Sequence, residues 1–395
     1  MGRAAARLRG GLSALAVAGL LASPAAAAPN RVAAAAPNRV AVAASVGAGA
    51  GAVAPEALTI DQLAGQRVIY AYAGLTPPPS LMAAIRAGEA AGVIFFADNV
   101  AAASQLQGVV TQLQRANASS PVHAPLLMLV DQEGGAVRRL PGAPVLSEKQ
   151  IGASAGGLAL ARQAGAGAAR TLLAAGVDVN LAPVLDVFRR AGNFIDAYGR
   201  SYSGDAGSVA RLGTAFITAQ QGLGIAATAK HFPGLGAAGA AQNTDRGPVT
   251  LTVGLSRLRS VDESPYRSAI AAGVKLVMTS WATYPALDDR RPAGLSAAVI
   301  GGELRGRLRF RGVTITDAIS AGALARFGSV AQRGVLAARA GADLVLCSAI
   351  NPADSSPEQG LSVLGAIASA LRRHRLPMAG ARQAAERIMA LRSAP

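Results

Sequence analysis

The chain has 395 residues, 51% of them hydrophobic, so it can bury a large core. Its formal net charge of +16 comes almost wholly from arginine, because only three of the 38 basic residues are lysine. The arginines are scattered rather than gathered in runs with aromatic residues, so we expect no nucleic-acid partner. The single cysteine, Cys347, excludes an internal disulfide and lies in an apolar run that predicts a buried thiol. With one cysteine and three scattered histidines, we expect neither a metal nor another cofactor.

Residues 1–28 have the three parts of a secretory signal peptide. Three arginines lie within the first nine residues, an apolar segment covers 12–21, and alanines at 26–28 provide small residues for cleavage. The apolar segment is shorter than the roughly 20 residues of a membrane-spanning helix. We therefore expect export, to the medium or to the cell wall or periplasm, and no transmembrane segment.

Residues 29–56 are rich in alanine, valine, proline and glycine, and Pro-Asn-Arg-Val occurs twice, at 29–32 and 37–40. This composition predicts a flexible linker.

From residue 57 to 395, short apolar runs alternate with helical patterns. The predicted helices include 154–175, 208–221 and 330–340. The predicted strands are 67–72, 92–96, 126–131, 178–182, 225–230, 275–280, 313–317 and 342–347. Eight strands, each followed by a helix or a long loop, predict an α/β fold, a single (β/α)8 TIM-type barrel, which needs about 250 residues. We expect no second domain and a monomer.

Lys230 and His231 are adjacent, although the chain has only three residues of each type. Two scarce polar groups at the end of a predicted strand indicate a ligand site; the alternative is a buried ion pair or a hydrogen-bonded core histidine. Polar or aromatic residues also end other predicted strands or follow them, namely Asp131, Asp186, Ser280, Trp281 and Asp317. Because TIM-barrel enzymes carry their chemistry at the C-terminal ends of the strands, we expect the site at this rim.

Several ordered motifs point to one family. They are Asp-Gln-Glu-Gly-Gly (131–135), Asn-Leu-Ala-Pro-Val-Leu-Asp (180–186), Gly-Arg-Ser (199–201), Lys-His-Phe-Pro-Gly (230–234), Leu-Ser (295–296) and Gly-Val-Thr-Ile-Thr-Asp (312–317). Together they resemble family 3 glycoside hydrolases, most closely the single-domain β-N-acetylhexosaminidases that trim peptidoglycan fragments. The resemblance runs from about residue 58 to 391.

The resemblance implies roles for individual residues. Asp317 would be the nucleophile that forms a covalent glycosyl-enzyme, because the transition state at the anomeric carbon is oxocarbenium-like. Asp131 would bind a hydroxyl of the terminal sugar. The hydroxyls and the N-acetyl group of that sugar would be held by Arg139, Arg200, Lys230 and His231.

Each of these assignments has a structural alternative. Asp317 would then be a hydrogen-bonding residue of the barrel rim, and Arg139 and Arg200 would be solvated or ion-paired. Glu133 is expected to orient its neighbours rather than to act on the substrate.

The chain departs from the family where the acid/base should be. The resemblance predicts an Asp-Ser-His triplet shortly after residue 234, with the histidine transferring the proton. Here the triplet is Asn243-Thr244-Asp245, and Leu235 stands where the family usually has a second histidine. Two-domain members supply a carboxylate from their second domain, for which no residues remain here. Asp245 is therefore the acid/base candidate, on a glycine- and alanine-rich loop that we expect to be mobile.

Three hypotheses follow. The first is a retaining, exo-acting glycosidase that uses Asp317 and Asp245 on a carbohydrate substrate. The second is a glycan-binding protein with little or no turnover, because the usual histidine is absent. The third is a β-glycosidase of altered specificity, acting on a sugar without an N-acetyl group.

Overall fold

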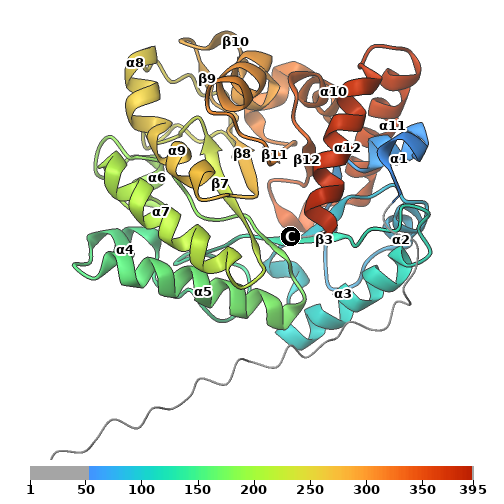
Figure 1. Cartoon of the computed structure of the whole chain (residues 1–395), viewed down its shortest axis with the longest axis horizontal. Coiled ribbons are helices and arrows are strands. Elements are labelled where there is room, and N and C mark those ends of the chain that lie inside the picture. Colours follow the sequence, from blue (N-terminus) through green and yellow to red (C-terminus); the bar gives the residue numbers. More distant parts are fainter. Residues whose placement is uncertain (1–52, 394–395) are drawn as a thin grey trace, which may run out of the picture. The chain divides into compact units, whose positions relative to one another are not determined.

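The computed structural model describes residues 53–393, which form one closed barrel of eight parallel strands surrounded by helices (Figure 1). The predicted signal peptide and positions 29–52 of the predicted linker lie outside the described residues. The strand order around the barrel is β1-β12-β11-β8-β7-β6-β3-β2, and β2 pairs with β1 to close it. This topology confirms the predicted TIM-type (β/α)8 fold.

All eight predicted strands are present. They are β1 (Val68–Tyr70), β2 (Gly92–Phe95), β3 (Leu127–Val130), β6 (Val179–Asn180), β7 (Ala226–Phe232), β8 (Leu276–Thr279), β11 (Val313–Ala318) and β12 (Leu344–Cys347). Two small antiparallel pairs stand outside the barrel, β4 (Gln132–Gly134) with β5 (Val137–Arg138), and β9 (Thr283–Tyr284) with β10 (Asp288–Pro292). The β4–β5 pair directly follows β3, so it lies next to the rim.

The helices are α1 (Ile60–Gly65), α2 (Pro79–Arg86), α3 (Ala103–Asn117), α4 (Glu148–Ala153), α5 (Gly157–Ala175), α6 (Phe194–Ala197), α7 (Ala206–Gln221), α8 (Leu255–Arg257), α9 (Ser264–Ala271), α10 (Val330–Ala340), α11 (Pro357–Arg372) and α12 (Met378–Ser393). Other helical segments include the π-helix η5 (Ala298–Arg307) and the 3-10 helix η6 (Gly322–Phe327). In Figure 1, α5 and α7 lie side by side on one side of the barrel, and α10 and α11 lie on the other.

Local signals explain where the helices begin and end. Helix α7 begins two residues before its predicted start because the Asp205 side chain accepts a hydrogen bond from Ser208 N at 2.7 Å. Helix α10 begins after Ser329, which forms a capping box with Gln332. It ends at Gly341, whose φ of +103° favours glycine.

The core has two layers because side chains alternate along each strand. One set of strand residues, such as Tyr70 and Val130, packs with residues of the surrounding helices. The other set, such as Ile69 and Leu129, forms a separate cluster that includes Ile388 of α12. This second cluster fills the barrel interior, with α12 packed against it, so the site residues stand on a solid core.

None of the helices within residues 53–393 is long and apolar enough to cross a membrane. In the same part of the chain, no group of three or more His, Cys, Asp or Glu side chains is arranged to hold a metal ion. Cys347 is buried, as predicted, and burial raises the pKa of its thiol.

Candidate active site

Five predicted site residues come from strand ends or from loops at the rim. Asp131 directly follows β3, and Arg200 lies in the loop after α6. Lys230 and His231 belong to β7, and Asp317 belongs to β11. Strand β7 runs two residues further than its apolar pattern predicted, so its polar pair is part of the sheet.

Lys230 and Glu133 form the buried centre of a charge cluster. Lys230 Nζ lies 2.6 Å from Asp131 Oδ1 and 2.7 Å from Glu133 Oε1. Arg200 donates to both Glu133 oxygens, from Nε at 2.9 Å and from Nη2 at 2.8 Å. The side chains of Lys230 and Glu133 are each only 2% exposed. Glu133 thus holds two cations together, Arg200 through a bidentate contact and Lys230 through one oxygen.

The cluster keeps its members charged. Burial alone would raise the pKa of Glu133, but Arg200 and Lys230 hold that pKa well below its usual range. Burial opposes the charged form of Lys230, yet Asp131 and Glu133 raise its pKa. The pKa of Arg200 is likewise raised by Glu133 against the effect of burial. Fixed charges of this kind suit the binding of polar groups better than proton transfer.

His231 is held by Asp186, which is fully buried. His231 Nδ1 lies 2.8 Å from Asp186 Oδ2, and Asp186 Oδ1 accepts hydrogen bonds from the backbone N–H groups of Leu235 at 2.6 Å and His231 at 3.3 Å. His231 Nε2 lies 3.4 Å from Arg200 Nη2, which can only donate. This arrangement fits the tautomer with the proton on Nδ1.

Asp317 and Asp245 are two further carboxylates at the rim. Both side chains are partly buried, and Asp317 Oδ1 accepts a hydrogen bond from Ala318 N at 2.7 Å. Burial, and then the nearby carboxylate of Asp317, raise the pKa of Asp245 to about 6. The fold therefore brings two carboxylates that are distant in sequence within electrostatic reach of each other, and it favours the protonated form of Asp245.

The loop that carries Asp245 contacts the segment that follows Asp317. Asp245 O accepts a hydrogen bond from Gly322 N at 2.9 Å, and Thr244 O accepts one from Ala323 N at 3.0 Å. Within the loop, Asn243 Oδ1 accepts from Asp245 N at 2.8 Å. Thr244 is only 3% exposed. The loop is therefore anchored at its middle despite its glycines and alanines.

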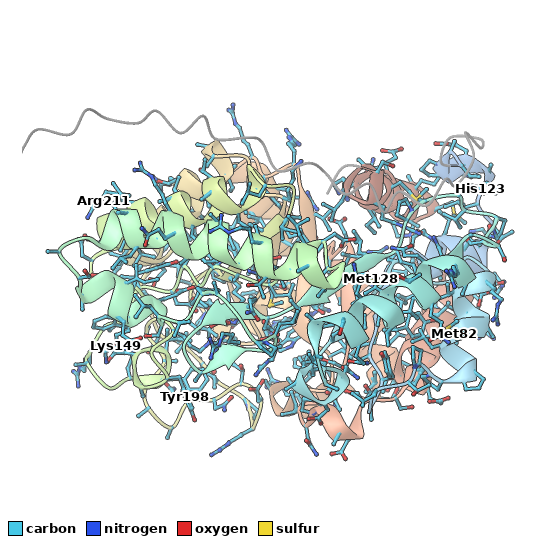
Figure 2. The ribbon with its side chains drawn as sticks, turned by 90° about the horizontal axis from the view of Figure 1, so that it is seen from below. Met82, His123, Met128, Lys149, Tyr198 and Arg211 are labelled. Carbon is cyan, nitrogen blue, oxygen red and sulfur yellow. The ribbon has the colours of Figure 1, made fainter. Side chains whose placement is uncertain are left out.

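The Arg200 loop is held by the start of α4. Lys149 N donates to Gly199 O at 3.2 Å, and Lys149 Nζ lies 2.9 Å from Asp196 Oδ1. Figure 2 shows Lys149 and Tyr198 on the same side of the molecule, with Tyr198 exposed. These contacts position the arginine that reaches Glu133.

Arg139 differs from the other predicted site residues. Its backbone N–H donates to Asp131 O at 3.3 Å, which places it beside the rim. Its Nε atom is buried and has no hydrogen-bond partner within residues 53–393, and its guanidinium forms no ion pair there. The structure therefore does not bring Arg139 into the charge cluster.

Comparison with known proteins agrees with this geometry. Residues 53–391 match the glycosyl hydrolase family 3 N-terminal domain. The chain belongs to glycosyl hydrolase family 3. A family relative from Arthroderma benhamiae, named an uncharacterized secreted glycosyl hydrolase, is 46% identical over 346 residues, covering 87% of this chain and 96% of its own. A β-hexosaminidase from Nitrosomonas eutropha is 34% identical over 274 residues, covering 68% of this chain and 75% of its own.

Solved structures of the family superpose on most of the barrel. A family 3 β-N-acetylglucosaminidase from Paenibacillus sp. str. FPU-7 has a TM-score of 0.79 and 36% identity, covering 85% of this chain. The match spans 62% of that longer chain. A β-N-acetylhexosaminidase from Beutenbergia cavernae has a TM-score of 0.75 and 29% identity, covering 85% of this chain and 98% of its own. Our chain is thus a glycosidase by homology.

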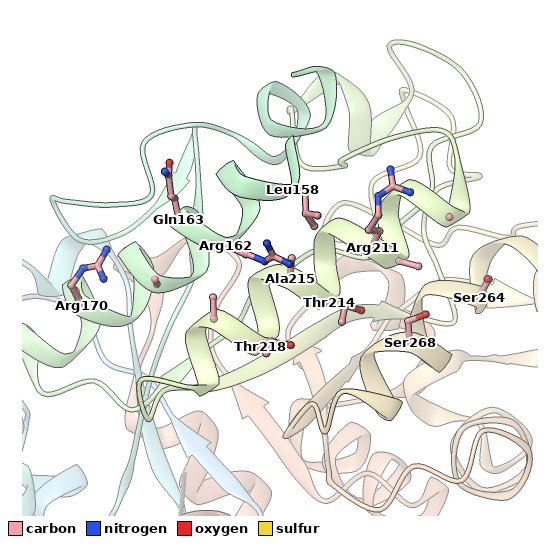
Figure 3. Close-up of a pocket in the computed structure, with 14 residues that line it drawn as sticks. Leu158, Arg162, Gln163, Arg170, Arg211, Thr214, Ala215, Thr218, Ser264 and Ser268 are labelled. Atoms are coloured by element: carbon pink, nitrogen blue, oxygen red, sulfur yellow. The ribbon is translucent and has the colours of Figure 1, made fainter. Parts of the chain in front are cut away.

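A separate groove of about 1080 Å³ lies on the outer wall of the family 3 barrel (Figure 3). It is lined by α5, α7 and α9 and contains none of the predicted site residues. Arg162, Arg170 and Arg211 line it together with serine and threonine hydroxyls. No carboxylate lines it, so it has no counterpart of the Asp317–Asp245 pair.

Sequence reasoning brought most of the site together but missed the role of one member, Asp186. Asp131, Arg200, Lys230 and His231 form one connected group, and Asp245 lies close to Asp317. Glu133 was expected to orient its neighbours, and its contacts with Arg200 and Lys230 agree with that expectation. Asp186 was expected at the rim without a role, although it is the hydrogen-bond partner of His231. The available signal was its place at the end of the 180–186 motif.

Proposed function

We propose that the protein is an exported, retaining, exo-acting glycosidase of the β-N-acetylhexosaminidase type, with Asp317 as nucleophile and Asp245 as acid/base. The proposal is carried by the pair itself: the loop of Asp245 is hydrogen-bonded to the segment that follows Asp317, and burial and the Asp317 carboxylate raise the pKa of Asp245 to about 6. An acid near neutrality beside a carboxylate nucleophile is what retaining hydrolysis requires.

In the first step, an Asp317 oxygen attacks the anomeric carbon and the glycosidic bond breaks. Asp245 gives its proton to the departing oxygen, which leaves as an alcohol. In the second step, Asp245 as carboxylate takes a proton from water while the water oxygen attacks the anomeric carbon and releases Asp317. Retaining enzymes keep the two carboxyl groups about 5 Å apart, so that both can reach the same bond.

The charge cluster would hold the terminal sugar. Asp131 offers carboxylate acceptors, and Lys230, Arg200 and His231 surround the same part of the rim. We propose a β-linked N-acetylhexosamine as that sugar, because relatives of this chain are named β-hexosaminidases and β-N-acetylglucosaminidase. Peptidoglycan-type glycans are the natural substrates that this sugar suggests.

Export rests on the N-terminal pattern and on the secreted relative from Arthroderma benhamiae. We propose cleavage after residue 28, leaving a linker to residue 56 and the catalytic barrel at 57–395. N-terminal sequencing of protein recovered from the culture medium tests this. A mature chain that begins at Met1 would contradict it.

The test of the activity is a panel of nitrophenyl glycosides with the purified protein, with Asp317→Asn as the blank. We expect turnover of the N-acetyl-β-glucosaminide by the natural chain and none by Asp317→Asn. Calorimetric binding of N-acetylglucosamine without turnover of any glycoside would instead support the glycan-binding hypothesis. Preference for a sugar without the N-acetyl group would support altered specificity.

The role of Asp245 is tested by the acidity of the leaving group. Because general acid catalysis contributes about 10²- to 10⁴-fold, Asp245→Asn should slow substrates with poor leaving groups by that order. Aryl glycosides whose leaving group needs no proton should be slowed far less. Equal slowing of both kinds would overturn the assignment of Asp245.

A further inference from the structure

Two segments distant in sequence meet beside the proposed catalytic pair. Residues 243–246 carry Asp245, and η6 begins at Gly322, five residues after Asp317. Gly322 N donates to Asp245 O at 2.9 Å, and Ala323 N donates to Thr244 O at 3.0 Å. We call this pair of backbone hydrogen bonds the clasp. It connects the acid/base loop directly to the segment that follows the nucleophile.

The clasp requires glycine at position 322. A Cβ on Gly322 would lie 2.5 Å from Arg246 O, 2.6 Å from Arg246 C and 2.9 Å from Asp245 O. These are backbone atoms, so they cannot rotate away as a flexible side chain would. The φ of Gly322 is not in the left-handed region, so the requirement is one of space alone. Any larger residue at 322 must therefore push the two segments apart.

The loop side of the clasp is also shaped from within. Asn243 Oδ1 accepts from Asp245 N at 2.8 Å, and Asn243 O accepts from the N–H groups of Arg246 and Gly247, each at 3.2 Å. An asparagine that bonds to the backbone two residues on is a local turn device. These hydrogen bonds and the burial of Thr244 fix the backbone on both sides of Asp245.

We propose that the clasp makes Gly322 a positioning residue, which holds Asp245 beside Asp317 as a preset acid/base that needs no loop closure. The inference rests on the proposed function. It replaces the mobile loop expected from composition with an anchored one. In this family member the substituted aspartate would have a fixed place, set by contact with the nucleophile's own loop.

The experiment compares Gly322→Ala with Gly247→Ala. Gly247 lies in the same loop, a Cβ added to it would meet no atom within 4 Å, and its φ is not left-handed. Gly247→Ala also keeps the N–H that bonds to Asn243, so it is a matched control. Both variants are measured with aryl N-acetyl-β-glucosaminides whose leaving groups span a range of acidity, and thermal unfolding checks that each is folded.

We expect Gly322→Ala to lose on the order of 10²-fold in kcat/KM for poor leaving groups, because a misplacement of about 1 Å in a catalytic group can cost that much. Good leaving groups should be affected much less, so the dependence on leaving-group acidity becomes steeper. The high-pH limb of activity should also move to lower pH, because an opened clasp admits water to Asp245. Gly247→Ala should match the natural chain in both respects.

Equal slowing of all substrates by Gly322→Ala, or behaviour like that of Gly247→Ala, would overturn the clasp. If Gly322→Ala does not fold, Asn243→Ala takes its place, since it removes one acceptor without a steric clash and makes the same prediction. Asp245→Asn in the same series separates the two proposals. A steep dependence in Asp245→Asn without one in the clasp variants contradicts the clasp alone, whereas a flat Asp245→Asn contradicts the acid/base assignment itself.

Discussion

Glu133 is the residue on which the two cations of the rim depend. Its oxygens accept from Arg200 and contact Lys230, and it is nearly fully buried. Removing its charge leaves Arg200 without its carboxylate partner and leaves Lys230 with Asp131. Without Glu133, the side chains of Arg200 and Lys230 would no longer be held in one position. Loss of Glu133 should therefore weaken substrate binding more than loss of an ion pair outside the rim.

Glu133→Gln should therefore lower the free energy of unfolding by about 3–5 kcal/mol and raise KM. Glu303 is a matched control, because it is also buried and also contacts two arginines, Arg259 and Arg307, outside the rim. Urea unfolding and steady-state kinetics on both glutamine variants give the comparison. A normal KM for Glu133→Gln, or an equally raised KM for Glu303→Gln, would contradict the role given to Glu133.

We expect the proposed acid/base, Asp245, to set the pH dependence of activity. Its pKa of about 6 is raised above the ordinary value of 3.8, so the folded state favours the protonated form. The associated stability is fully present below about 3.8 and is lost as the pH rises through about 6. Proton donation follows the same sign, so kcat/KM for poor leaving groups should fall above about pH 6. A pH–rate profile checks this, and the limb should be absent in Asp245→Asn; a limb kept unchanged in that variant would contradict it.

At the scale of elements, the structure shows which parts of the site have a signal in the sequence. Apolar runs located all eight strands, because a strand buried on both faces must be apolar along its length. The predicted strand stopped at Lys230 and missed His231 and Phe232, because the polar pair ends the apolar run although both of its residues remain in the sheet. The clasp was not predictable, since it joins backbone groups of two loops. A glycine such as Gly322 shows a need for space only when its neighbour is known.

Asp186 connects the end of β6 to the end of β7. It lies after β6 yet accepts hydrogen bonds from His231 and Leu235 at the end of β7. Asp186→Asn can no longer accept from all three donors, so His231 should lose its fixed tautomer. Loss of such a partner typically costs 10- to 100-fold in metal sites, and we expect a decrease of about that order in kcat/KM here. Asp205→Asn, at the exposed start of α7, is the control and should leave kcat/KM unchanged; an unchanged kcat/KM in Asp186→Asn would contradict the positioning role.

At the scale of the whole molecule, a second buried carboxylate that pairs with arginines lies at the end of the barrel away from the rim. Asp343 precedes β12, at the end away from the rim, and is fully buried. It accepts from Arg387 Nη2 at 2.6 Å and from Thr314 N at 2.8 Å, and it pairs with Arg305. One carboxylate thus joins β11, β12, η5 and α12, much as Glu133 joins loops at the rim.

Asp343 and Glu133 should therefore differ in their effect on activity. Asp343→Asn leaves two partly buried arginines without a countercharge, so it should lower the free energy of unfolding by about 3–5 kcal/mol. Because barrel enzymes keep their chemistry at the other face, kcat/KM of the folded variant should stay within about twofold of the natural chain. Urea unfolding and kinetics well below the unfolding temperature measure the two quantities. A fall in kcat/KM comparable to that of Glu133→Gln would show that the ends of this barrel are coupled rather than independent.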